Sequence, residues 1–130
     1  MGHGYTRYTQ LDVTTASPEV LVAKLFQAAI RHTRRAKELS GTGQPAARGV
    51  AIQKATAIVQ ELRVSLDLEN GGEISRNLAA LYDFVVDKLM EGNLHRAAGP
   101  LEEAVGVLET LEDAWSQIVS GAVSEQRVAP

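Results

Sequence analysis

The chain has 130 residues, of which 45% are hydrophobic and 22% charged, a composition typical of one globular domain. It contains no cysteine, which excludes disulfides, thiolate metal sites and thiol nucleophiles and fits a reducing compartment. Its net charge is −3, so the protein lacks the excess of positive charge that attracts a phosphate backbone, and we expect no nucleic-acid partner. The sequence has neither a secretory signal nor an apolar run of the ~20 residues that span a membrane. We therefore expect a cytoplasmic protein without membrane insertion.

Three segments differ in composition. Residues 1–16 are polar and irregular but carry scattered apolar side chains, and we expect a flexible N-terminal strap. Residues 17–120 hold four stretches with helical periodicity and form the predicted domain. Residues 121–130 follow the last periodic stretch and are predicted to form a disordered tail.

The four helices have recognisable boundaries. Ser17 is a good N-cap and Pro18 suits the first helical position, so the first helix begins there and ends before the Gly-rich segment 40–45. The second is expected over about 46–68, ending before Asn70-Gly71-Gly72. The third runs from about 74 to 92, and the fourth from about 99 or 100 to 118. Short connections between long helices predict an all-α, antiparallel four-helix up-down bundle.

The apolar faces of these helices are wide. On the third helix they cover roughly 200° of the helical wheel, about twice the arc of an ordinary bundle helix. Two interpretations stay open: a deep core, or a core plus a groove for an amphipathic partner. The groove candidates lie beside the main apolar stripes and in the strap: Tyr5, Tyr8, Leu11, Val22, Leu25, Phe26, Ile52, Val59, Leu78, Tyr82 and Val86.

Catalytic and metal-binding patterns are lacking. His3, His32 and His95 are far apart in the sequence, and Glu91 with His95 does not match the Glu-x-x-His pairs of dimetal bundles. No phosphate loop or nucleophile elbow occurs. We therefore predict no enzymatic activity, no metal and no cofactor. The basic strip Arg31, Arg34, Arg35 and Lys37 is predicted to be either a solvated face that compensates the helix dipole or a site for an acidic partner.

Several short sequence motifs resemble those of one protein family. They are TASP (15–18), SLDLENGGEI (65–74), ALYDF (80–84) and LEDAW (111–115), in this order and spacing. Over about residues 5–118 the chain resembles the flagellin-specific export chaperone family, FliS. It departs where Ala97 replaces the aspartate that usually opens the fourth helix, which leaves the start of that helix open.

The resemblance implies a function. FliS-type proteins are cytosolic bundles that bind the disordered C-terminal segment of flagellin, prevent premature filament polymerisation and deliver flagellin to the flagellar type III export gate. It implies a 1:1 complex with the last ~40–60 residues of flagellin through helix-in-groove contacts. It also implies that the strap covers the groove until flagellin arrives. The alternative is a non-catalytic, self-associating four-helix adaptor, which would need no client.

Overall fold

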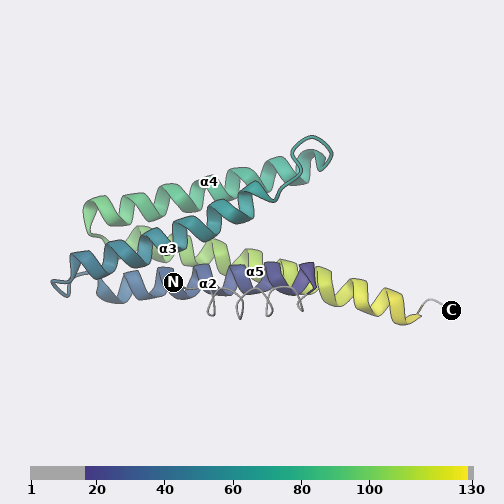
Figure 1. Ribbon diagram of the computed structural model, residues 1–130, viewed down its shortest axis with the longest axis horizontal. Coiled ribbons are helices and arrows are strands. Elements are labelled where there is room, and N and C mark those ends of the chain that lie inside the picture. The colour runs from purple at the N-terminus through teal and green to yellow at the C-terminus, as the bar shows by residue number, and fades with distance from the viewer. Residues whose placement is uncertain (1–16, 129–130) are drawn as a thin grey trace, which may run out of the picture.

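The computed structural model describes residues 17–128, with side chains described to residue 121. Four helices follow one another: α2 (Pro18–Leu39), α3 (Pro45–Val64), α4 (Gly72–His95) and α5 (Ala98–Val128). Consecutive helices run in opposite directions, as the ribbon in Figure 1 shows. The predicted all-α antiparallel four-helix bundle is confirmed.

Helix α2 begins and ends as the local sequence predicts. The Ser17 hydroxyl accepts a hydrogen bond from the N–H of Val20 (3.3 Å), and Pro18 occupies the first turn, where no N–H is needed. At the other end the N–H of Ser40 donates to the carbonyl of Lys37. The following Gly41 has a φ of 79°, a left-handed conformation that side chains disfavour, so the chain turns there into α3.

Helix α3 ends at Val64, one turn before the predicted end at about residue 68. The Ser65 hydroxyl donates to the carbonyl of Leu62 (2.7 Å), and the Asp67 carboxylate accepts the N–H of Asn70 (3.0 Å). Such side-chain-to-backbone bonds compete with helix continuation. They convert the segment before Gly72 into a turn, although the apolar spacing of Leu66 continues the helical pattern.

The α4–α5 connection is two residues long. Arg96 has a φ of 53°, and the N–H of Ala97 bonds to the carbonyl of Gly92 (3.1 Å), so α4 ends in a left-handed cap. Helix α5 begins at Ala98, slightly before the expected residue 99 or 100. It continues to Val128, past residue 121, where the expected tail begins; that the tail is disordered stays a prediction. The last turns of α5 extend beyond the other helices (Figure 1).

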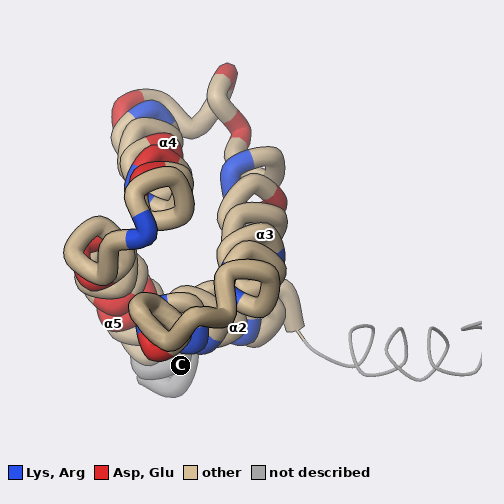
Figure 2. The backbone as a smooth tube through the Cα atoms, turned by 90° about the vertical axis from the view of Figure 1, so that its left-hand side faces the viewer, with Lys and Arg blue, Asp and Glu red and all other residues tan. Residues whose placement is uncertain are grey.

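The four helices occupy the corners of a ring, each packed mainly against its two neighbours (Figure 2). The interior is aliphatic, with Phe26 and Tyr82 as its buried aromatic pair, their ring centroids 6.4 Å apart. Gly92 permits close approach of α4 and α5, because a Cβ there would lie 2.6 Å from the side chain of Leu101. The fully buried large side chains come from all four helices: Thr33, Val59, Leu62, Val85, Leu89, Leu101 and Leu108.

Charge is distributed unevenly around this ring. Helix α2 carries five basic and two acidic residues, whereas residues 98–121 of α5 carry five acidic and no basic residues. Arg34 pairs with Glu109, and Lys37 pairs with Glu102 at 3.0 Å. Figure 2 shows the basic residues gathered along α2 and the acidic residues along α5 and α4. Opposite charges on adjacent antiparallel helices favour this neighbour arrangement.

Candidate partner-binding surface

An apolar groove runs between α2 and α3 on one side of the bundle. Its volume is about 560 Å³. Val64 is 83% exposed at its edge, although it is a large aliphatic residue. We call this the α2–α3 groove; it is lined by Pro18, Leu21, Val22, Leu25, Ala57, Gln60, Glu61, Val64 and Ser65.

A second apolar groove lies between α4 and α5, with a volume of about 410 Å³. Small residues in the middle of α5, Gly106 and Thr110, leave room for the aliphatic and aromatic side chains around them. The side chains of Leu81 and Phe84 are 39% and 38% exposed there. We call this the α4–α5 groove; it is lined by Leu81, Phe84, Glu103, Gly106, Val107, Thr110 and Leu111.

Charged groups lie beside the aromatic ring of the α4–α5 groove. The Lys88 ammonium lies 5.4 Å from the centre of the Phe84 ring, within the range of a cation–π contact. The same ammonium pairs with Glu91 and Glu103, each at 3.2 Å. The Lys88 ammonium donates hydrogen bonds to the carboxylates of Glu103 and Glu91, and these bonds raise the pKa of Lys88 above its ordinary value. The groove therefore has an apolar floor and a polar rim, the usual anatomy of a protein interface.

The two grooves lie on opposite sides of the molecule. In the ring of Figure 2, α2 and α3 form one edge and α4 and α5 form the facing edge. A short peptide would therefore occupy only one of them. A segment that fills both must pass around the bundle.

The structure separates the groove candidates into four groups. Val22 and Leu25 line the α2–α3 groove as half-buried side chains. Leu78 and Val86 are half-buried against the core and line neither groove. Four others are buried in the core and offer almost no surface in this conformation: Phe26, Ile52, Val59 and Tyr82. The last three, Tyr5, Tyr8 and Leu11, lie outside the described residues.

Sequence reasoning did not single out several groove residues. The groove candidates taken from the sequence do not include Leu21, Val64, Leu81 and Phe84, yet the structure places these residues in the lining of the two grooves. For Leu81 and Phe84 the sequence signal is the wide apolar arc on α4. Leu81 and Phe84 lie at the edge of that arc nearest α5, whereas Tyr82 lies within its buried part.

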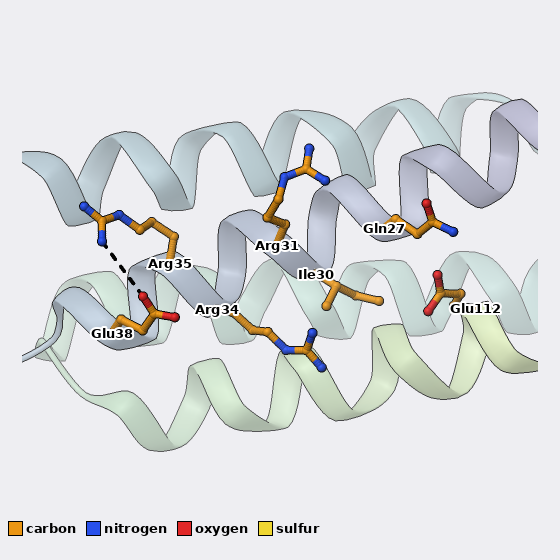
Figure 3. A pocket seen from close by; sticks show the side chains of 7 residues that line it. All are labelled: Gln27, Ile30, Arg31, Arg34, Arg35, Glu38 and Glu112. Carbon is orange, nitrogen blue, oxygen red and sulfur yellow. Dashed lines mark ion pairs between the residues drawn. The ribbon is translucent and has the colours of Figure 1, made fainter.

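The basic strip on α2 is partly neutralised by the protein itself. Arg34 pairs with Glu109 of α5, and Arg35 lies 3.9 Å from Glu38 of its own helix. An open hollow of about 470 Å³ lies beside these side chains. Figure 3 shows its lining, with Arg31, Arg34 and Arg35 on α2 and Glu112 on α5. The sequence leaves open an acidic partner for the basic strip, and carboxylates of α5 pair with part of that strip within the protein itself.

The histidine on α2 has a perturbed pKa. Burial lowers the pKa of His32 first, and the nearby positive charges of Arg31 and Lys54 lower it further. Both effects favour the neutral form of the imidazole. Among the described residues, no group of three histidine, aspartate or glutamate side chains is placed to hold a metal ion.

Nothing within residues 17–128 combines the helix length and hydropathy needed to cross a bilayer. The fold resembles that of a solved structure described as a flagellar chaperone from bacteria, with a TM-score of 0.74 and 22% identity over 91% of this chain and 96% of the other.

Sequence comparison identifies closer relatives. The chain is 38% identical over 120 residues to the flagellar secretion chaperone FliS of Salmonella typhimurium, covering 88% of this chain and 89% of the relative. It is 33% identical over 119 residues to FliS of Escherichia coli, covering 88% of each chain, and 30% identical over 115 residues to FliS of Bacillus subtilis, covering 88% and 85%. The family model for the flagellar protein FliS matches residues 1–122. The chain belongs to the FliS family of flagellar secretion chaperones.

Proposed function

We propose that this protein is a non-catalytic cytoplasmic export chaperone that binds the C-terminal segment of flagellin. It would keep flagellin from polymerising early and deliver it to the flagellar export gate. The observation that carries the proposal is the pair of apolar grooves on opposite sides of one bundle. Large exposed apolar surfaces on a soluble domain are typical of binding sites.

The arrangement of the grooves favours a long, unfolded client over a folded one. A helix rises 1.5 Å per residue, so a helix of roughly 20 residues would match the length of α3. Two such helices with a connection around the bundle are compatible with the ~40–60 residues that the family resemblance implies for the flagellin segment. A disordered segment of this length can wrap a surface that a rigid partner cannot reach.

Binding of this kind needs no bound nucleotide or metal. The client loses conformational entropy when it becomes ordered, and burial of its apolar side chains in the two grooves offsets that loss. The net binding free energy is the gain from apolar contact minus the free-energy cost of ordering the client. Because this difference is modest, the client can be released at the export gate. The relatives from Salmonella typhimurium and Escherichia coli are flagellar secretion chaperones, which supports this function.

The test is co-purification with flagellin from the same organism. We expect a 1:1 complex by size-exclusion chromatography with light scattering. Flagellin lacking its last ~60 residues should not bind, because the proposed contacts lie in that segment. Equal binding by the truncated flagellin would contradict the proposal. A homo-oligomer that forms without flagellin and does not bind it would instead support a self-associating adaptor.

The structure provides matched variants for this experiment. Leu81→Lys and Phe84→Lys place a charge in the α4–α5 groove and should weaken binding by at least tenfold, about 1.4 kcal/mol. Met90→Lys and Leu94→Lys are the controls, because these residues are 61% and 77% exposed on α4 and line neither groove. Equal losses in both pairs would show that the α4–α5 groove is not the contact surface.

A further inference from the structure

A small pocket of about 180 Å³ lies at the end of the bundle where the α2–α3 loop meets the α4–α5 turn. Figure 1 shows both connections at the same end, far from the α3–α4 turn. Gly41, Gly43 and Gln44 of the loop line the pocket, together with Arg48 of α3 and Arg96 of the turn. We call it the end pocket.

Arg48 is a buried arginine without an acidic partner among the described residues. Its side chain is 5% exposed, and its Nε has no hydrogen-bond partner. Its one described side-chain hydrogen bond runs from Nη2 to the carbonyl of Asn93 at 3.4 Å, longer than the usual 2.9–3.0 Å of an N–H···O bond. A guanidinium has five N–H donors, and the described residues provide an acceptor only for Nη2. Burial of a charge is costly unless the charge is paired, so this arginine requires a partner.

A second cation reaches the same pocket. Arg96 adopts a left-handed conformation with a φ of 53°, and its N–H donates to the carbonyl of Gly92. This cap fixes the backbone conformation at Arg96, and the residue lines the end pocket. No described ion pair involves Arg96. Two positive charges therefore line a pocket to which no aspartate or glutamate contributes.

The N-terminus of α3 carries unpaired donors close to the end pocket, although the residues that provide them, Ala46 and Ala47, do not line it. Gln44 is the N-cap residue, but its side chain makes no capping hydrogen bond. Pro45 has no N–H, and the N–H of Arg48 bonds to the carbonyl of Gln44 (3.1 Å). The N–H groups of Ala46 and Ala47 remain without a described acceptor at the positive end of the helix dipole.

We propose that the end pocket binds one small oxyanion, a carboxylate or a phosphate group. The anion accepts hydrogen bonds from the guanidinium of Arg48, and Arg96 supplies the second positive charge. The volume accommodates such a group with a few waters, since one water takes about 30 Å³ of liquid volume. Because Arg48 belongs to α3 and Arg96 to the α4–α5 turn, the bound anion joins the two connections at this end of the bundle. This site is separate from both apolar grooves and does not depend on the proposed client.

The test measures thermal unfolding of the full chain in inorganic phosphate, in acetate and in chloride at equal ionic strength and pH 7. We expect a saturable rise in Tm of roughly 3 °C in at least one of the two oxyanions over chloride. A rise in phosphate alone identifies a phosphate site, and a rise in acetate identifies a carboxylate site. The Arg96→Ala variant should lose the rise. Arg76→Ala removes the same charge near the opposite end of α4 and should keep it.

Phosphate also stabilises proteins by exclusion from their surfaces, an effect that does not saturate and does not need Arg96. A rise of equal size in wild type and Arg96→Ala would therefore overturn the proposal. A second readout is the Nε–H resonance of Arg48 in ¹⁵N-labelled protein, assigned by its loss in Arg48→Lys. We expect that resonance to shift with the same saturation curve as Tm. A resonance that stays unchanged at saturating phosphate and acetate would equally overturn the site.

Discussion

The indole N–H of Trp115 on α5 donates a 2.9 Å hydrogen bond to the main-chain carbonyl of Glu19 in the first turn of α2, across 96 positions of sequence. The ring is half-buried, packs against the core cluster and lines a hollow between these two helices. Trp115 therefore joins the C-terminal part of the bundle to the point where the chain enters it.

This relationship predicts a structural role for Trp115. Trp115→Ala should lower the free energy of unfolding by about 2–3 kcal/mol, less than for a fully buried tryptophan because the ring is partly exposed. Trp115→Phe keeps much of the apolar contact and loses the hydrogen bond, so it should cost about 1 kcal/mol. Urea unfolding followed by circular dichroism measures both. A loss below 1 kcal/mol in Trp115→Ala together with lost flagellin binding would move Trp115 into the binding surface.

The Arg63–Asp83 pair between α3 and α4 predicts a dependence on pH. Arg63 donates from Nε (2.7 Å) and Nη2 (3.1 Å) to the Asp83 carboxylate. These hydrogen bonds hold the pKa of Asp83 below its ordinary value of 3.8. A depressed pKa in the folded state means that the contribution is complete above pH 3.8 and is lost as the pH falls through the folded value.

Asp83→Asn should therefore lower Tm at pH 7, and the difference from wild type should shrink toward pH 2. The effect is small because both side chains are exposed. Asp87→Asn, one turn further along α4 and without a described ion pair, serves as the control. A difference between Asp83→Asn and wild type that stays constant from pH 7 to pH 2 would exclude the ion pair as its cause.

Gly92 allows the close contact between α4 and α5. Gly92→Ala places a Cβ against Leu101, which is fully buried and has little room to move. We expect a loss of about 1–3 kcal/mol in unfolding free energy. Gly49→Ala on α3 meets no atom within 4 Å and should instead stabilise the protein by about 0.5–1 kcal/mol. If the Leu101→Ala background does not reduce the cost of Gly92→Ala, the steric explanation is wrong.

The N-terminal segment lies outside the described residues, and its role stays a prediction. Deletion of residues 1–12 keeps the Ser17 cap, so the bundle should still fold. If the apolar side chains of this segment cover a groove, the truncated protein should self-associate more and bind flagellin with altered affinity. Light scattering and titration with flagellin test both effects. Unchanged solubility together with unchanged affinity would reduce the segment to an inert tail.

Local sequence predicted the number of helices, most of their boundaries and the class of fold. Ser17-Pro18 predicts the start of α2, and the Gly-rich connections predict short turns, because capping and left-handed backbone depend on neighbouring residues alone. Apolar spacing of three and four predicts which side of each helix faces inward. The early end of α3 was missed because the Asp67–Asn70 turn competes with a helical pattern that continues through Leu66.

The tertiary structure decided which apolar residues form the core and which form the grooves. Phe26 and Leu25 are adjacent in sequence and equally apolar, yet one is buried and the other lines a groove. Likewise, Tyr82 is buried while Phe84 is accessible. Periodicity defines the direction of a face, but the width that neighbouring helices cover depends on how those helices pack and on small residues such as Gly106 on the facing helix. The same packing brings the arginines of α2 to the carboxylates of α5, a pairing of distant positions that no local pattern contains.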